Sequence, residues 1–146
     1  MKKNFNNYYM ELNCPYWQHS IWLRAFELYK FVNSELKKNT CISENLKDKL
    51  LETTANIHFN VAKSLCSEIL EESISACTTA QKELEKNFKQ IVTLLNYNKI
   101  DKTFYRKYEA MQNRLENKLV NLNLKFSMEL SLSRKTFVRK TGKQIG

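Results

Sequence analysis

The chain lacks helix-breaking residues over nearly its whole length. Its 146 residues include one proline, Pro15, and two glycines, Gly142 and Gly146, so residues 16–141 contain neither type. All-β folds depend on tight turns that use both residues, and the common phosphate-binding loops need glycines close together. The sequence argues against both and predicts a small all-α protein with long helices and few turns.

Apolar residues recur at helical spacing in four segments. The expected helices cover residues 16–38, 44–65, a third stretch that begins near 67–72 and ends at 96, and 102–130. Ser43 and Asp101 are expected N-caps, because their side-chain oxygens accept free backbone N–H groups at a helix start. Long helices joined by short loops favour an up-down-up-down four-helix bundle. The chain divides into an N-terminal segment, the bundle and a basic tail, at residues 1–15, 16–131 and 132–146.

The first expected helix has more apolar surface than one core stripe needs. Its stripe consists of Ile21, Ala25, Leu28, Val32 and Leu36. A second apolar edge, which we call the aromatic edge, is formed by Trp22, Phe26 and Tyr29. Together the two cover close to half of the helix circumference, which is wide for a surface helix. Either the helix is deeply packed in the bundle, or the aromatic edge is an interface with another subunit of a homo-oligomer.

No group of residues has the composition and spacing of a catalytic or metal site. The cysteines have no zinc-binding spacing, and the Glu-x-x-His pattern of di-iron bundles is absent. His58 is expected to be a partly buried, hydrogen-bonded side chain rather than a base. We therefore expect a protein that is not an enzyme and has no catalytic residues, cofactor or metal. Its four cysteines are expected to be reduced thiols: Cys14, Cys41, Cys66 and Cys77.

The N-terminus lacks the continuous apolar run of a secretory signal, and no stretch approaches the length of a membrane span. Together with reduced thiols, this predicts a cytoplasmic protein that does not enter a membrane.

Positive charge is concentrated in the C-terminal third of the chain. The formal net charge is +9, and residues 98–146 hold twelve basic and four acidic residues. A basic ridge follows one line of the fourth helix and consists of Lys107, Arg114, Lys118 and Lys125. The acid-free tail adds Arg134, Lys135, Arg139, Lys140 and Lys143. Such a ridge and tail predict a polyanionic partner, most often RNA or DNA, less often an anionic membrane surface.

Short motifs between residues 46 and 126 match those of a known protein family. The second-helix pattern Ile-x-x-Asn-Ile-Ala-Glu-Gly is matched at Ile57, Asn60, Val61 and Ala62. Lys63 and Ser64 replace its Glu-Gly. The third-helix pattern is matched at Ala80, Glu83 and Leu84, and the following turn at residues 98–101 before Phe104 and Tyr105.

Through these motifs the chain resembles a family of small bacterial four-helix bundles with two branches. One is encoded in intervening sequences of large-subunit ribosomal RNA, and the other is the accessory variability protein (Avd) of diversity-generating retroelements. The changes at Lys63 and Ser64 disfavour the ribosomal branch. The resemblance implies a ring-shaped homopentamer that performs no chemistry. In the accessory branch it implies binding to a reverse transcriptase and its RNA during mutagenic retrohoming.

Two alternatives stay open. The chain is similar enough to the ribosomal branch to be one of its members, with a role that the sequence does not define. It also has an aromatic N-terminus suited to a protein-binding or membrane-surface adaptor, with Phe5, Tyr8, Tyr9, Tyr16 and Trp17.

Overall fold

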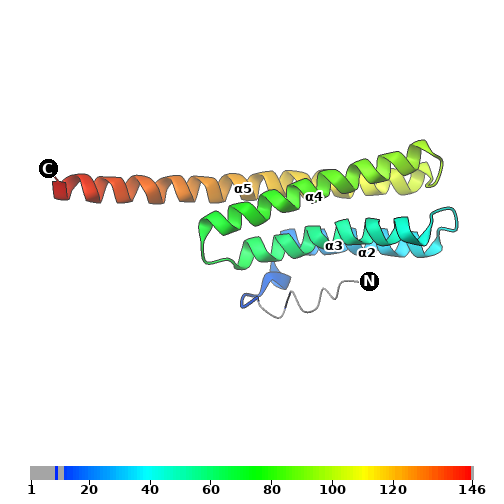
Figure 1. Ribbon diagram of the computed structural model, residues 1–146, viewed down its shortest axis with the longest axis horizontal. Helices are drawn as coiled ribbons and strands as arrows, with labels where there is room; N and C mark the ends of the chain where they lie inside the picture. The colour runs from blue at the N-terminus through cyan, green and yellow to red at the C-terminus, as the bar shows by residue number, and fades with distance from the viewer. Residues whose placement is uncertain (1–8, 10–11, 146) are drawn as a thin grey trace.

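The computed structural model is a bundle of four helices. It describes Tyr9 and residues 12–145, with side chains up to residue 135. A short 3-10 helix, η1, precedes the four long helices, and the elements are η1 (Tyr16–Gln18), α2 (Ser20–Lys38), α3 (Glu44–Cys66), α4 (Leu70–Asn96) and α5 (Lys102–Ile145). Each long helix runs antiparallel to the next, with α2 and α3 in one layer and α4 and α5 in the other (Figure 1). The predicted all-α four-helix bundle is confirmed.

Two helix starts follow the predicted caps, and the first long helix begins later than predicted. Ser43 Oγ accepts from the backbone N–H of Leu46 at 3.3 Å, and Asp101 Oδ1 accepts from that of Phe104 at 2.7 Å. The first helix, expected over residues 16–38, is instead interrupted at His19. The extended backbone of His19 separates η1 from α2, and its Nδ1 accepts from the Ile21 N–H at 3.3 Å. A histidine cap carries no strong sequence signal, so the break was not predicted.

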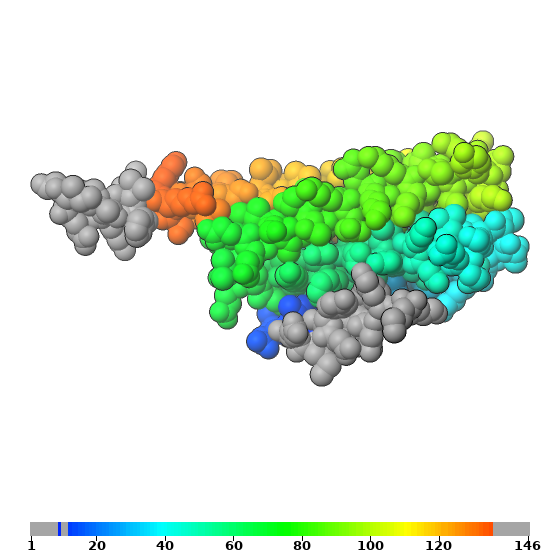
Figure 2. Space-filling model, in the orientation of Figure 1, coloured from blue at the N-terminus to red at the C-terminus, as the bar shows by residue number. Residues whose placement is uncertain are grey.

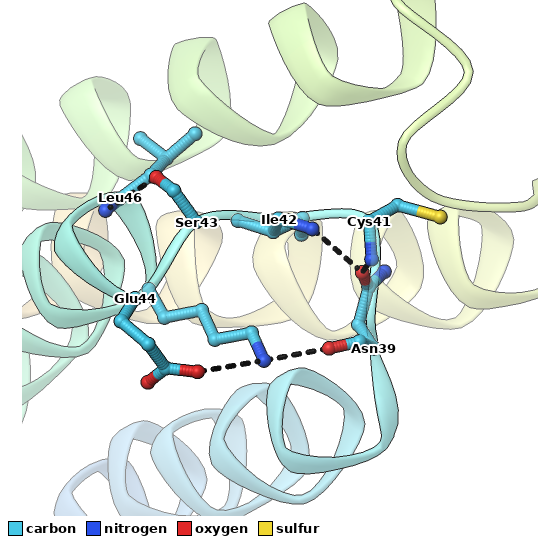
Figure 3. A network of polar contacts seen from close by, with 7 residues as sticks. Asn39, Cys41, Ile42, Ser43, Glu44 and Leu46 are labelled. Carbon is cyan, nitrogen blue, oxygen red and sulfur yellow. Dashed lines mark hydrogen bonds and ion pairs between the residues drawn. The ribbon is translucent and has the colours of Figure 1, made fainter.

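Asn39 organises the turn between α2 and α3 (Figure 3). Its side-chain oxygen accepts from the backbone N–H groups of Cys41 and Ile42, at 2.7 and 3.1 Å. Its backbone carbonyl accepts from Nζ of Lys47 at 2.6 Å. Its side-chain nitrogen donates to the carbonyl of Lys99, in the turn between α4 and α5, at 2.8 Å. One side chain thus connects the two turns at this end of the bundle.

The core is built from one apolar stripe of each long helix. All five residues of the stripe predicted for the first helix are buried. The other helices contribute Leu50, Ile57 and Val61 from α3, Cys77, Leu84 and Ile91 from α4, and Tyr108, Leu115 and Leu119 from α5. Removing such side chains from water is the main favourable contribution to folding.

A buried polar cluster connects three helices inside this core. Asn87 of α4 is fully buried and donates to Thr53 of α3 at 3.0 Å, and it accepts from the hydroxyl of Tyr108 of α5. Thr53 Oγ1 in turn lies 2.8 Å from the side-chain oxygen of Gln90. A buried amide without partners would be costly, so these bonds favour a single register of α3, α4 and α5.

The prediction of four reduced cysteines is wrong for two of them. Cys14 and Cys66 form a disulfide between the segment before η1 and the end of α3. Cys41 is free and exposed, and Cys77 is free and buried. The paired cysteines are 52 residues apart, so only the folded chain brings them together. Reduced thiols were one argument for a cytoplasmic location, and the disulfide removes that argument. The cytoplasmic location stays a prediction.

The last helix is longer than expected. It was predicted to end near Leu130, with a separate tail from residue 132, but α5 continues to Ile145 and has 44 residues. No glycine or proline interrupts it before Gly142, so nothing in the local sequence ends the helix earlier. The far end of α5 projects beyond the other helices (Figures 1 and 2).

Candidate nucleic-acid interface

The predicted basic ridge lies on the surface of α5. Lys107, Arg114 and Lys125 are exposed, and Lys118 is half-buried. At about 1.5 Å per residue, the ridge extends over roughly 27 Å of the helix. Among the described side chains, no acidic group forms an ion pair with any of the four. Their charges are therefore available to a polyanion.

The start of α2 lies beside the C-terminal half of this ridge. Burial lowers the pKa of His19, and the nearby charges of Lys125 and Lys118 lower it further. Both effects disfavour the protonated form of His19, and its side chain already accepts a backbone N–H as the α2 cap.

The tail residues fall into two groups. Arg134 lies 3.9 Å from Glu71 of α4, with both side chains more than half exposed, and Lys135 is exposed. Solvent screening makes such a surface pair weak, so Arg134 can exchange Glu71 for a phosphate at little cost. Three predicted residues have side chains outside the described part of the structure: Arg139, Lys140 and Lys143.

A second basic row on α4 was missed by the sequence analysis. Lys82, Lys86 and Lys89 are exposed and spaced four and three residues apart, so they share one helix face. They line a shallow groove of about 420 Å³, where Lys89 pairs with Glu85 at 3.1 Å. The signal was present as helical spacing, but the small net negative charge of residues 39–97 hid it.

The aromatic edge of α2 is packed within the chain. Trp22 stacks on Phe26 with ring centroids 4.9 Å apart, and Phe26 stacks on Tyr29 at 6.1 Å. The other side is formed by Tyr9, whose hydroxyl hydrogen bonds with His58 Nδ1 and accepts from Trp22 Nε1 at 3.2 Å. All three residues of the edge are half-buried. Contact of this edge with another subunit stays a prediction.

His58 occupies the centre of the aromatic cluster. It is 5% exposed, and the ring centroids of Phe26 and Tyr29 lie 5.5 and 5.1 Å from its own. This burial lowers the pKa of His58 to about 4. Burial also raises the pKa of the Cys77 thiol, to about 11. His58 is hydrogen-bonded, as expected, and it is more deeply buried than the partly buried side chain that the sequence predicted.

The described residues hold neither a candidate metal site nor a candidate membrane span. No three His, Cys, Asp or Glu side chains gather closely enough there to hold a metal ion. None of the helices in that part of the chain combines the length and apolar content needed to cross a membrane. No protein-family model matches the chain, and no curated protein or solved structure is significantly similar to it.

Proposed function

We propose that this chain is a non-catalytic accessory protein that binds nucleic acid through the basic ridge of α5. One observation carries the proposal: the four cations of the ridge lie on one line of the helix, and three of them are exposed. None of the four forms an ion pair with a described acid. Neutralising phosphates with such residues releases condensed counterions, which drives binding without sequence recognition.

The assembly and the protein partner of this proposal come from the resemblance to the accessory variability proteins. By that resemblance the chain forms a ring of five copies and holds a reverse transcriptase together with its RNA. A ring would place several ridges around one nucleic acid, and linked weak contacts gain affinity through avidity. A reverse transcriptase encoded beside this gene, and retained by the tagged protein, is the expected partner.

RNA affinity measured over a range of salt concentrations tests the ridge. The test variant replaces Lys107, Arg114, Lys118 and Lys125 with glutamine. We expect binding to weaken and the slope of log affinity against log salt to become shallower by about three, since each lost phosphate contact contributes roughly 0.7–0.9. The matched control replaces Lys82, Lys86 and Lys89 of α4 with glutamine and should keep most of the slope.

Three outcomes would overturn this assignment. Equal losses in both variants would mean that net charge, and not the ridge, attracts RNA. An unchanged slope in the ridge variant would exclude these four residues as phosphate contacts. Binding to anionic vesicles that persists at high salt, without binding to RNA, would favour the adaptor function instead.

A further inference from the structure

The end of α5 has two apolar faces instead of one. From residue 121 to 133 apolar and polar residues alternate strictly, and the apolar ones are Leu122, Leu124, Phe126, Met128, Leu130 and Leu132. This period of two is the pattern of a strand, yet the segment is helical. In a helix each step of two residues turns the chain by about 200°, so alternate apolar residues lie on opposite faces.

The two faces differ in what they contact. Leu122 packs against the bundle core, and Phe126 and Leu130, which share its face, are half-buried. The opposite face, which we call the outer row, is exposed by 41, 57, 65 and 62% at Val120, Leu124, Met128 and Leu132. Monomeric proteins seldom leave a continuous apolar row on their surface.

From this row we propose that α5 pairs with α5 of a second copy of this chain, antiparallel, through the outer row. The row has residues every four positions and is symmetric about its centre. In an antiparallel pair related by a two-fold axis, Leu124 lies level with Met128 of the copy, and Val120 with Leu132. Rows at this spacing interlock at a crossing angle of about −50°.

Charge favours a second copy as the occupant. Between residues 120 and 133 the helix carries two charges, Lys125 and Glu129, four residues apart on one flank of the outer row. An antiparallel two-fold pair places this flank against the same flank of the copy. Lys125 of each copy then lies close to Glu129 of the other, so the two charges of this segment attract across the contact.

The start of the outer row also borders a recess. Val120 lines a groove of about 390 Å³ between α4 and α5, together with Leu84 and Phe88. In the proposed pair Leu132 of the copy lies level with Val120 and is placed to enter this groove. The contact is isologous, so it forms pairs and does not close a ring. Within the ring of the proposed function it would join two rings.

The native mass of the 146-residue chain, measured by light scattering at the highest soluble concentration, tests the pairing. The test variant is Leu124→Asp with Met128→Asp, and the control is Leu23→Asp on the exposed face of α2. We expect the test variant to have half the mass of the wild type, with a pair dissociation constant raised about 100-fold or more. The control should keep the wild-type mass and so exclude a general effect of an added acid.

The flank charges supply a second readout that does not disturb the apolar row. Lys125→Glu alone and Glu129→Lys alone should each weaken pairing, and the two together should restore it. A wild type of one chain, or a mass unchanged by the outer-row variant, would overturn the pairing. Failure of the double charge variant to restore the mass would overturn the antiparallel arrangement. Lys125 is also a ridge residue, so its variants can change RNA binding as well. The Leu124→Asp, Met128→Asp variant leaves all four ridge residues in place and its mass is measured without RNA, so it tests the pairing separately from the proposed function.

Discussion

Two apolar surfaces lie outside the four-helix core, and they differ in whether the chain covers them. The aromatic edge of α2 is covered by the chain itself, because Tyr9 reaches Trp22 and His58. The outer row of α5 stays exposed, with Met128 at 65%. The first surface has a segment tethered next to it by the Cys14–Cys66 disulfide, whereas no tether of this kind is described beside the second.

The comparison shows how a short connection decides what covers an apolar surface. Cys66 ends α3 eight residues after His58, so the disulfide holds Cys14 at the same end of the helix and keeps Tyr9 near the aromatic cluster. Tethering raises the effective concentration of Tyr9 at this place. A surface without such a tether depends on a separate molecule, whose association depends on concentration.

The largest effect should come from breaking the tether. Replacing Cys14 and Cys66 with serine removes a cross-link across 52 residues, and the lost loop-closure constraint predicts a decrease of about 2–4 kcal/mol in the free energy of unfolding. Urea denaturation followed by circular dichroism measures it. Tryptophan fluorescence should also change, because Tyr9 no longer stays against Trp22.

The matched control for this prediction is Cys41→Ser, which removes an exposed free thiol and should leave stability within about 0.5 kcal/mol of the wild type. Equal stability of the Cys14→Ser, Cys66→Ser variant and the wild type would show that Tyr9 covers the aromatic edge without help from the disulfide.

The next largest effect is an acid sensitivity centred on His58. Its pKa is about 4 in the folded chain, against an ordinary value of 6.5. Between these two values the unfolded chain binds a proton that the folded chain does not, so stability falls as the pH decreases from 6.5 to 4. The full effect is about 3 kcal/mol.

The contribution of His58 is measured as the difference in pH slope between the wild type and His58→Gln, using urea denaturation at each pH. In the His58→Gln variant, the free energy of unfolding should decrease much less between pH 6.5 and 4 than in the wild type. His19 is a more exposed histidine, so His19→Gln should keep most of the wild-type decrease. If the free energy of unfolding had the same slope against pH in the wild type and in His58→Gln, the aromatic cluster would have to open and admit water before His58 is protonated.

Features of the fold that depend on local sequence could be predicted. Ser43 and Asp101 cap helices because a side-chain oxygen at that position satisfies a nearby N–H. The stripe from Ile21 to Leu36 is buried because helical spacing alone puts its residues on one face. The end of α5 was misjudged because a basic segment without acids resembles a disordered tail.

Features of the site that depend on distant residues could not be predicted in the same way. The ridge was found because Lys107 and Lys125 belong to one helix, and spacing gives their relative direction. Nothing local indicates that Tyr9 covers Trp22, or that Cys14 meets Cys66 rather than staying a thiol. These contacts exist only when the fold has brought both partners together.

The smallest expected effect compares two neighbouring leucines of α5. Leu122 is partly buried against the core and Leu124 is 57% exposed. In dilute solution Leu122→Ala should cost about 1–2 kcal/mol of unfolding free energy, and Leu124→Ala less than about 0.5 kcal/mol. At high chain concentration the order should change, because association stabilises the folded state by mass action and Leu124 lies in the pairing contact. A cost of Leu124→Ala that is large and independent of concentration would mean that the outer row is covered within one chain, as the aromatic edge is. The two apolar surfaces would then differ only in which segment of the chain covers them.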